Sequence, residues 1–195
     1  MSSTSKIVGR NMKPVGLAPA VALVNPKYPR NVGQAMRACS CFGISQLWFS
    51  GNRVSLDPSQ GRLPREERMK GYKDVELIQY DYFFDMFDKS VTPVAIEVRP
   101  NSEVMSNFEH PENPLYVFGP EDGSIPDVVA RHCHRFVIIP IRHCSNLSAA
   151  VYMTLYDRQL KRHWAGLDPI PLPQDCMHED RGYEIEHAEV TIQRH

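Results

Sequence analysis

The sequence predicts an α/β protein whose mostly parallel sheet is flanked by helices. Short apolar runs alternate with segments of helical character along most of the chain. The apolar runs are continuously hydrophobic and do not alternate with polar residues, which is typical of strands covered on both faces. Polar residues and glycines follow several of these runs directly. This arrangement places ligand sites at the carboxyl ends of the strands.

Each expected strand is bounded by Pro, Gly, Asn or a charged residue. The strands span residues 20–24, 46–50, 93–97, 115–118 and 135–139. The expected helices span residues 31–42, 81–88, 126–132 and 146–164. Asn31 suits the N-cap of the first helix, and Gly43 suits a left-handed residue at its end. In the last helix, residues recurring every four positions indicate a core or dimer face: Leu147, Val151 and Leu155.

The length and composition predict one domain. A chain of 195 residues with 42% hydrophobic content can bury one substantial core. We expect this domain to span residues 18–165, preceded by a polar, mobile arm at 1–17 and followed by an extension at 166–195. The long polar segment 50–74 is basic in its second half, and a loop of that length is usually functional or mobile.

The charge balance excludes a strong overall attraction to nucleic acid. The formal net charge is -1, so RNA binding requires a local basic patch. Arg65, Arg68 and Lys70 in the long polar segment are candidate substrate-binding residues, and the basic residues that close the last helix, at 158 and 161–163, are a second candidate RNA-binding cluster. The N-terminal residues lack the apolar core of a signal peptide, and no run is long enough to span a membrane. We therefore expect a cytoplasmic protein that does not bind membranes.

The cysteines predict reduced thiols. Their number is five, which is odd, and no secretory signal accompanies them. Cys39 with Cys41, and the cluster at 132–134, lack the two-residue spacing of zinc knuckles. Alternate neighbours on a helix or strand also point apart. We expect no metal site.

Three motifs follow three of the expected strands. The first contains Asn31, Gly33, Arg37, Phe42 and Gly43. The second contains Gly119, Glu121 and Gly123. The third contains Ile139, Pro140, Asn146 and Ser148. In this order, and over residues 19–164, the motifs resemble those of the SpoU/TrmH class of SPOUT methyltransferases.

The resemblance implies a fold, a cofactor and a reaction. Proteins of this class form a C-terminal trefoil knot and act as homodimers, although general topology rules would argue against a knot. They hold S-adenosylmethionine against the backbone of three knot loops and usually methylate a ribose 2′-hydroxyl of RNA. The chain resembles the short, single-domain members, which modify tRNA. We therefore expect a methyltransferase acting on tRNA or rRNA.

The resemblance also implies roles for four catalytic residues. Arg37 would meet the substrate phosphate and hydroxyl. A guanidinium normally keeps its proton, which favours positioning over base catalysis. Asn31 would support the site through hydrogen bonds, and Glu121 would orient the loops or the arginine. Asn146 would hold the third loop against the cofactor.

The cofactor-binding residues implied by the resemblance come from the ends of three strands. They are Glu97, Gly119, Ile139, Cys144, Ser145 and Leu147. The sequence departs from the family at Cys144, where serine is common, and the preceding segment 141–143 is short. Because a thiol is a weak hydrogen-bond donor, the expected hydroxyl contact is weakened or moved to Ser145.

Two alternatives follow from this departure and from the diversity of related proteins. One is a non-catalytic SPOUT-like protein that binds RNA or a partner. The other is a methyltransferase that acts on a base nitrogen. A catalytic thiol at Cys144 beside His143 is disfavoured, because sequence neighbours rarely face each other productively.

Overall fold

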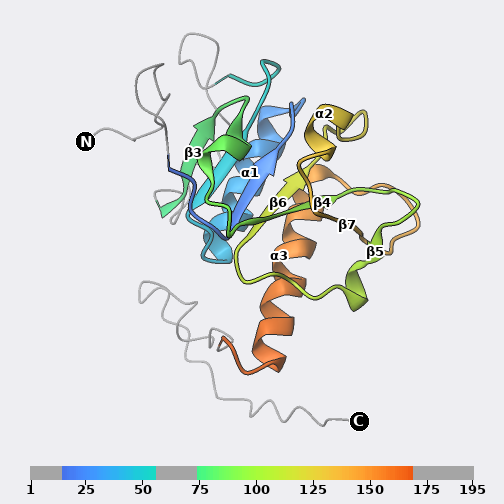
Figure 1. Ribbon diagram of the computed structural model, residues 1–195. Helices are drawn as coiled ribbons and strands as arrows, with labels where there is room; N and C mark the ends of the chain where they lie inside the picture. Colours follow the sequence, from blue (N-terminus) through green and yellow to red (C-terminus); the bar gives the residue numbers. More distant parts are fainter. Residues whose placement is uncertain (1–14, 56–73, 169–195) are drawn as a thin grey trace, which may run out of the picture.

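The computed structural model describes residues 15–55 and 74–168. Seven strands form its centre: β1 (Ala20–Leu23), β2 (Gln46–Phe49), β3 (Glu76–Gln79), β4 (Thr92–Ile96), β5 (Glu103–Val104), β6 (Pro114–Phe118) and β7 (Arg135–Ile138). They make one sheet in the order β3-β2-β1-β6-β4-β7-β5, and all neighbouring strands run parallel (Figure 1). The predicted α/β class with a parallel sheet is confirmed.

The five expected strands all form, within two residues of their predicted ends. The sequence did not predict β3 and β5. The outer strand β3 pairs with β2 alone and begins and ends with half-buried polar residues, whereas β5 has only 2 residues. Neither strand therefore carries the continuous apolar run that marks a strand covered on both faces.

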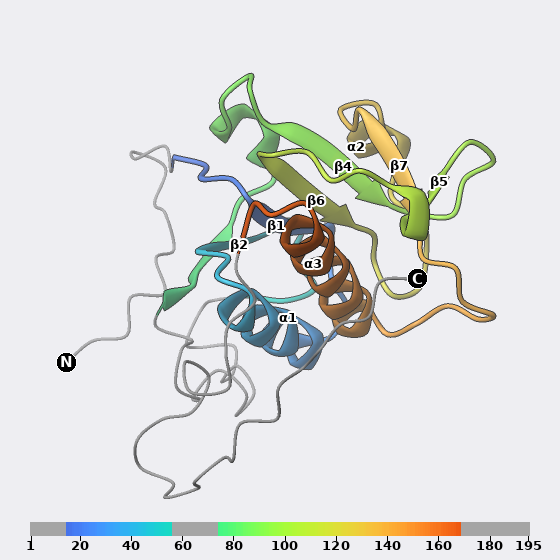
Figure 2. The same cartoon turned by 90° about the horizontal axis from the view of Figure 1, so that it is seen from below.

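Helices cover both faces of the sheet. The helices are α1 (Pro29–Cys41), α2 (Asp127–Ala130) and α3 (Leu147–Trp164), and two 3-10 turns are η4 (Phe83–Met86) and η5 (Met105–Asn107). Figure 2 shows α1 and α3 side by side on one face, where they pack on Val21 and Leu23. On the opposite face, η4 and α2 pack on Ala20 and Ala22. Both faces of β1 are thus buried, as its sequence requires.

The start of α1 corrects a prediction. Asn31 is not the N-cap, because the helix begins at Pro29 and Tyr28 is the capping residue. Proline favours the first helical position and forces the residue before it into extended backbone, which Tyr28 adopts with φ -115° and ψ 122°. The Tyr28 carbonyl accepts the Asn31 N–H at 2.9 Å. The Asn31 side chain is therefore available for a contact outside the helix.

The helix predicted at 81–88 is wrong, since only η4 forms there. Phe83 and Met86 are buried three residues apart, which matches a single 3-10 turn. The predicted end of α1 is confirmed. Gly43 has φ 69°, and the Ile44 N–H reaches back to the Cys39 carbonyl at 2.9 Å, as in a Schellman motif.

The C-terminal half of α3 is anchored to the segment that precedes β6. His110 lies 2.5 Å from the Tyr116 hydroxyl through Nδ1 and 2.7 Å from Asp157 through Nε2. Lys161 also pairs with Asp157, at 2.7 Å, and donates to the carbonyl of Phe108 at 3.0 Å. The basic residues near the end of α3 therefore stabilise the fold, although their number alone suggested an RNA-binding face.

Residues outside the described ranges leave several predictions open. The arm predicted at 1–17 lies mostly outside them, but the Leu17 N–H donates to Gln46 Oε1 at 2.8 Å. The extension at 166–195 also lies mostly outside. The trefoil knot and the domain boundaries stay predictions. None of the helices within 15–55 and 74–168 combines the length and hydrophobicity needed to cross a membrane.

The buried histidine gives stability a specific pH dependence. Its side chain is 2% exposed, and burial lowers the pKa of His110 from 6.5 to about 4, although Asp157 opposes this shift. The unfolded chain therefore binds a proton first as the pH falls. Stability from this group is complete above pH 7 and is lost towards pH 4, by about 3 kcal/mol in the free energy of unfolding.

We expect His110→Gln to be less stable than the wild type at pH 7.5 but to lose less stability on acidification. Urea unfolding at several pH values between 7.5 and 4 measures both slopes. Carboxylates titrate alike in both proteins, so the difference between the two slopes of unfolding free energy against pH reports the protonation of His110. Parallel curves for the two proteins would contradict this assignment.

Candidate active site

Glu121 connects the second motif to the start of α1. Its carboxylate accepts the backbone N–H of Lys27 at 2.7 Å and that of Tyr28 at 3.3 Å. It also accepts a hydrogen bond from Asn31 Nδ2 at 2.6 Å. These are donors at a helix N-terminus, where a negative charge is favourable. The loop after β6 is thereby held on the loop after β1.

Asn31 and Asn146 connect the first motif to the third. Asn146 Nδ2 donates to Asn31 Oδ1 at 3.0 Å. Asn146 is also the N-cap of α3, because its Oδ1 accepts the Ser148 N–H at 2.9 Å. One amide therefore starts a helix and joins two loops that are 115 residues apart in sequence.

The polar chain ends between α1 and α3. The Ser148 hydroxyl lies 2.6 Å from Asn146 Oδ1 and 2.7 Å from the Gln34 amide oxygen. Asn31 and Ser148 are only 4% and 5% exposed. Polar groups buried to this degree must have partners, and here each partner is another motif residue or its neighbour. Sequence reasoning missed Gln34, which lies one helical turn after Asn31.

A second set of contacts surrounds Asp122. Arg53 donates to its two carboxylate oxygens at 2.9 Å each, and Lys27 Nζ lies 3.1 Å away. These two cations hold the pKa of Asp122 at about 2. Gly51 has φ 84°, and a Cβ there would lie 2.3 Å from Asn25 Oδ1, so glycine is required for the close approach of the two loops.

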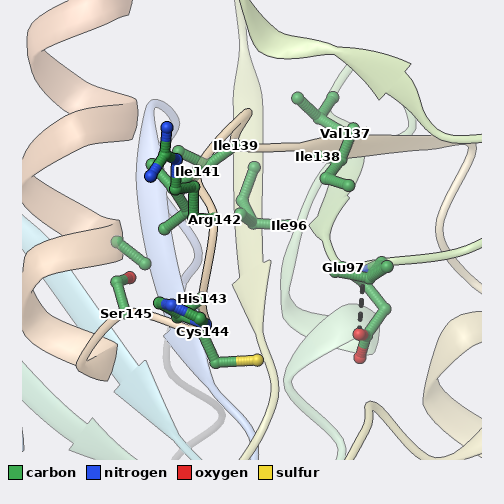
Figure 3. A pocket seen from close by; sticks show the side chains of 12 residues that line it. Ile96, Glu97, Val137, Ile138, Ile139, Ile141, Arg142, His143, Cys144 and Ser145 are labelled. Atoms are coloured by element: carbon green, nitrogen blue, oxygen red, sulfur yellow. Dashed lines mark hydrogen bonds between the residues drawn. The ribbon is translucent and has the colours of Figure 1, made fainter.

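A pocket of about 350 Å³ opens beside this network (Figure 3). Its walls come from the carboxyl ends of β4 and β7, the loop that follows β7, and the first turn of α3. The lining is aliphatic at Ile96, Val137 and Ile138 and polar at Glu97 and the loop. A ligand site at the carboxyl ends of the strands was expected from the sheet type, and the structure has one.

Four of the six expected cofactor residues line this pocket: Glu97, Ile139, Cys144 and Ser145. Figure 3 shows the Cys144 side chain between the loop and Glu97. The loop also contributes residues that sequence reasoning had not selected: Ile141, Arg142 and His143. The only signal for them was their place between Pro140 and Asn146.

Gly119 and Leu147 are not among the lining residues. A Cβ on Gly119 would lie 3.1 Å from the Ile125 nitrogen, so glycine is needed here for a close approach of the second loop to itself. The N–H of Ile125 in turn donates to Glu97 Oε2 at 2.7 Å. Leu147 is buried in the core between the sheet and α1. Both residues therefore belong to the structure around the pocket and not to its lining.

Arg37 lies on the exposed side of α1, about 9 Å along the helix from Asn31. Within the described part of the chain it forms no hydrogen bond or ion pair. Burial raises the pKa of Tyr152 on α3, and the charge of Arg37 partly opposes this shift. Glu121 therefore orients the loops and does not contact this arginine. Arg65, Arg68 and Lys70 lie outside the described residues.

No group of three or more potential metal ligands gathers within residues 15–55 and 74–168. The cysteines in these ranges are free thiols: Cys39, Cys41, Cys133 and Cys144. Burial raises the pKa of Cys133 to about 12, which keeps that thiol protonated.

Comparison with known proteins gives the family. The model of the SpoU rRNA Methylase family matches residues 18–156, which is well over half of the chain. The chain belongs to this family. It is therefore an S-adenosylmethionine-dependent RNA methyltransferase, as the order of the three motifs predicted.

Individual family members are distant in sequence. The tRNA (cytidine-2′-O-)-methyltransferase TrmJ of Methanocaldococcus jannaschii is 25% identical over 163 residues, which is 73% of this chain and 68% of TrmJ. The crystal structure of a TrmH/SpoU tRNA modifying enzyme from A. aeolicus has a TM-score of 0.63 at 17% identity and covers 80% of each chain. The AdoMet complex of AviRb from Streptomyces viridochromogenes also gives 0.63, at 15% identity over 80% of this chain and 62% of that one. These two likenesses show the same fold.

The Glu121 contacts give a prediction for stability. In Glu121→Gln, the amide NH2 faces one of the N–H donors that the carboxylate accepts. We expect the variant to lose about 1–3 kcal/mol of unfolding free energy, measured by urea denaturation at pH 7.5. Asp122→Asn is the matched control, since it changes the neighbouring carboxylate, whose ion pairs are exposed, and should cost less. Equal losses would show that Glu121 does not hold the loops together.

Proposed function

We propose that this chain methylates a ribose 2′-hydroxyl of tRNA. The observation that carries the proposal is the hydrogen-bonded chain from Glu121 through Asn31 to Asn146, which gathers three motifs beside one pocket. The similarity to TrmJ, whose name specifies transfer to a cytidine 2′-oxygen of tRNA, supports this substrate.

The pocket fits S-adenosylmethionine in size and chemistry. A volume of about 350 Å³ lies within the usual range of small-molecule sites, which is roughly 300–1,000 Å³. Its aliphatic walls suit a purine, and the loop with Cys144 and Ser145 offers polar groups for the amino-acid end. When bound, the cofactor supplies an electrophilic methyl group on a sulfonium. The chain must bring the ribose oxygen into line with it.

Arg37 is the residue we assign to this alignment. Its side chain is exposed and, among the described residues, carries no ion pair, so it is available for a phosphate of the RNA. A guanidinium binds a phosphate with two parallel hydrogen bonds, which fixes the backbone of the substrate as well as its distance. The ribose next to that phosphate is then held over the pocket. Asn31 and Asn146 keep α1 and the third loop in register while this happens.

We also propose that the chain acts as a homodimer in the cytoplasm. Exposed apolar residues lie on α3 and just past its end. Tyr156 and Trp164 are 56% and 62% exposed and eight residues apart, which places them on the same side of α3, and Leu167, which follows the helix, is 60% exposed. Aromatic residues exposed along one helix face are typical of interaction sites. A second copy of the chain is the partner that the family resemblance favours.

The role of Arg37 predicts a selective loss of transfer. We expect Arg37→Ala to reduce methyl transfer to tRNA roughly a hundredfold or more while S-adenosylmethionine binding is unchanged. Transfer is measured with radiolabelled cofactor, and nucleoside mass spectrometry identifies the product. Arg131→Ala is the control, because Arg131 is also exposed but follows α2 on the opposite face of the sheet. Unchanged transfer in Arg37→Ala would remove Arg37 from the mechanism, and a base-methylated product would exclude the ribose acceptor.

The dimer proposal predicts a specific change in mass. Sedimentation at micromolar concentration should give twice the chain mass of 22.3 kDa. Trp164→Glu should shift the protein towards the monomer by placing a charge in the interface. Tyr82→Glu, which alters an aromatic residue 73% exposed outside α3, should not. A wild-type monomer, or equal effects of the two variants, would contradict an interface on α3.

A further inference from the structure

Lys27, Tyr28, Arg53 and Asp122 form a cluster that the proposed mechanism does not use. It lies directly beside the catalytic network, because Lys27 and Tyr28 donate their backbone N–H groups to Glu121. The two cations converge on the Asp122 carboxylate, and Lys27 Nζ also lies 5.3 Å from the centre of the Tyr28 ring. One aromatic ring and two cations thus meet at the edge of the active site.

Tyr28 has a fixed backbone, and its side chain is open to solvent. Its backbone is fixed by Glu121 on one side and by the N–H of Asn31, which donates to its carbonyl, on the other. Pro29 further restricts its backbone to extended conformations. Yet the residue is 50% exposed and does not contribute to either hydrophobic core. An exposed aromatic ring on a fixed backbone is a feature on which unpaired bases stack in RNA-binding proteins.

The two cations are arranged as they would be around a phosphate. Arg53 forms a bidentate pair with Asp122, and a guanidinium makes the same two parallel bonds to phosphate oxygens. Lys27 approaches the same carboxylate from a second direction. Asp122 itself is half-exposed, so an incoming anion can replace it without entering the protein core. The carboxylate therefore keeps the cations together when RNA is absent.

We propose that Tyr28 stacks on a base of the bound RNA, and that Lys27 and Arg53 bind a neighbouring phosphate in exchange for Asp122. This inference rests on the proposed function, since it adds specificity to the same RNA site. It assigns Tyr28 to the recognition of an unpaired nucleotide beside the methylated ribose. Stacking accepts any base, so the cluster selects a single-stranded segment and not a sequence.

If the cluster served only as a structural brace that holds three loops together, the ion pairs would be the same but the effects of substitutions would differ. Removing either side of the pairs would then have the same consequence. In the exchange proposed here, loss of a cation weakens RNA binding, whereas loss of Asp122 removes a competing anion and does not. Asp122→Asn is therefore the matched control for Lys27→Ala and Arg53→Ala.

Binding of fluorescently labelled unfractionated tRNA, measured by anisotropy at several salt concentrations, tests the cluster. Tyr28→Ala should bind at least about fivefold more weakly than the wild type, and Tyr28→Phe should bind like the wild type. Lys27→Ala and Arg53→Ala should each lower the slope of log affinity against log salt by about 0.7–0.9. Asp122→Asn should bind as tightly as the wild type or more tightly. S-adenosylmethionine binding, measured in parallel, shows that each variant is folded.

Two results would overturn the inference. One is wild-type tRNA affinity in Tyr28→Ala; the other is equal weakening by Asp122→Asn and by the cation variants, which would leave a brace only. Methyl transfer is measured separately, and the stacking role predicts a higher KM with little change in kcat for Tyr28→Ala. If the wild type binds tRNA but transfers no methyl group to it, the proposed function fails, and the stacking role is still decided by the anisotropy.

Discussion

The hydrogen bonds from Glu121 to Asn31 and from Asn31 to Asn146 are the constraint on which the site depends. Glu121 lies in the loop after β6, Asn31 in the first turn of α1 and Asn146 at the N-cap of α3, and the sheet brings these motifs only to the same edge. Loops that merely share an edge can move independently. Loops joined through the Asn31 side chain cannot, because Asn31 is 4% exposed and separating the loops would leave its buried amide without partners. The network therefore makes the three neighbouring motifs one rigid support beside the pocket.

The network also links binding to the reaction. Asn31 lies in the first turn of α1, and Arg37 lies on the same helix, so the position of the arginine follows that of the amide. Asn146 caps α3, and the residues just before it line the pocket. A displacement of any of the three motifs would move the substrate-binding arginine relative to the cofactor. Methyl transfer needs close alignment of the two reactants, so this coupling explains why polar residues occupy positions that could have been apolar.

The sequence predicted the architecture where burial leaves a strong pattern. Strands covered on both faces, such as β1 and β6, read as continuous apolar runs, whereas the edge strands β3 and β5 do not. The predicted start of α1 was wrong because asparagine is a common N-cap, whereas Pro29 begins the helix and makes Tyr28 the capping residue. Local propensity could not show that the Asn31 side chain has a better partner 90 residues away.

The site was predictable to the level of its loops but not of its contacts. Motif order identified the loops, because parallel strands end at the same edge. The pairing of Asp122 with Lys27 and Arg53, and the contribution of Gln34, depend on side chains that meet only after folding. The number of basic residues near the end of α3 suggested an RNA-binding face. In the structure these cations bind carboxylates and carbonyls of the protein itself. Net charge near zero thus hides both structural pairs and a small cationic cluster at the active site.

Titration calorimetry with S-adenosylmethionine, on the wild type and on Asn146→Ala, tests the central claim most directly. Asn107→Ala, which alters an exposed asparagine in η5, serves as the control. If the network holds the pocket together, the wild type and the control bind the cofactor saturably, with affinity in the micromolar range. Asn146→Ala should then bind it at least about tenfold more weakly, because the hydrogen bonds of the Asn146 side chain to Asn31 and Ser148 are lost. Equal affinity in all three proteins, or no binding by the folded wild type, would contradict the account.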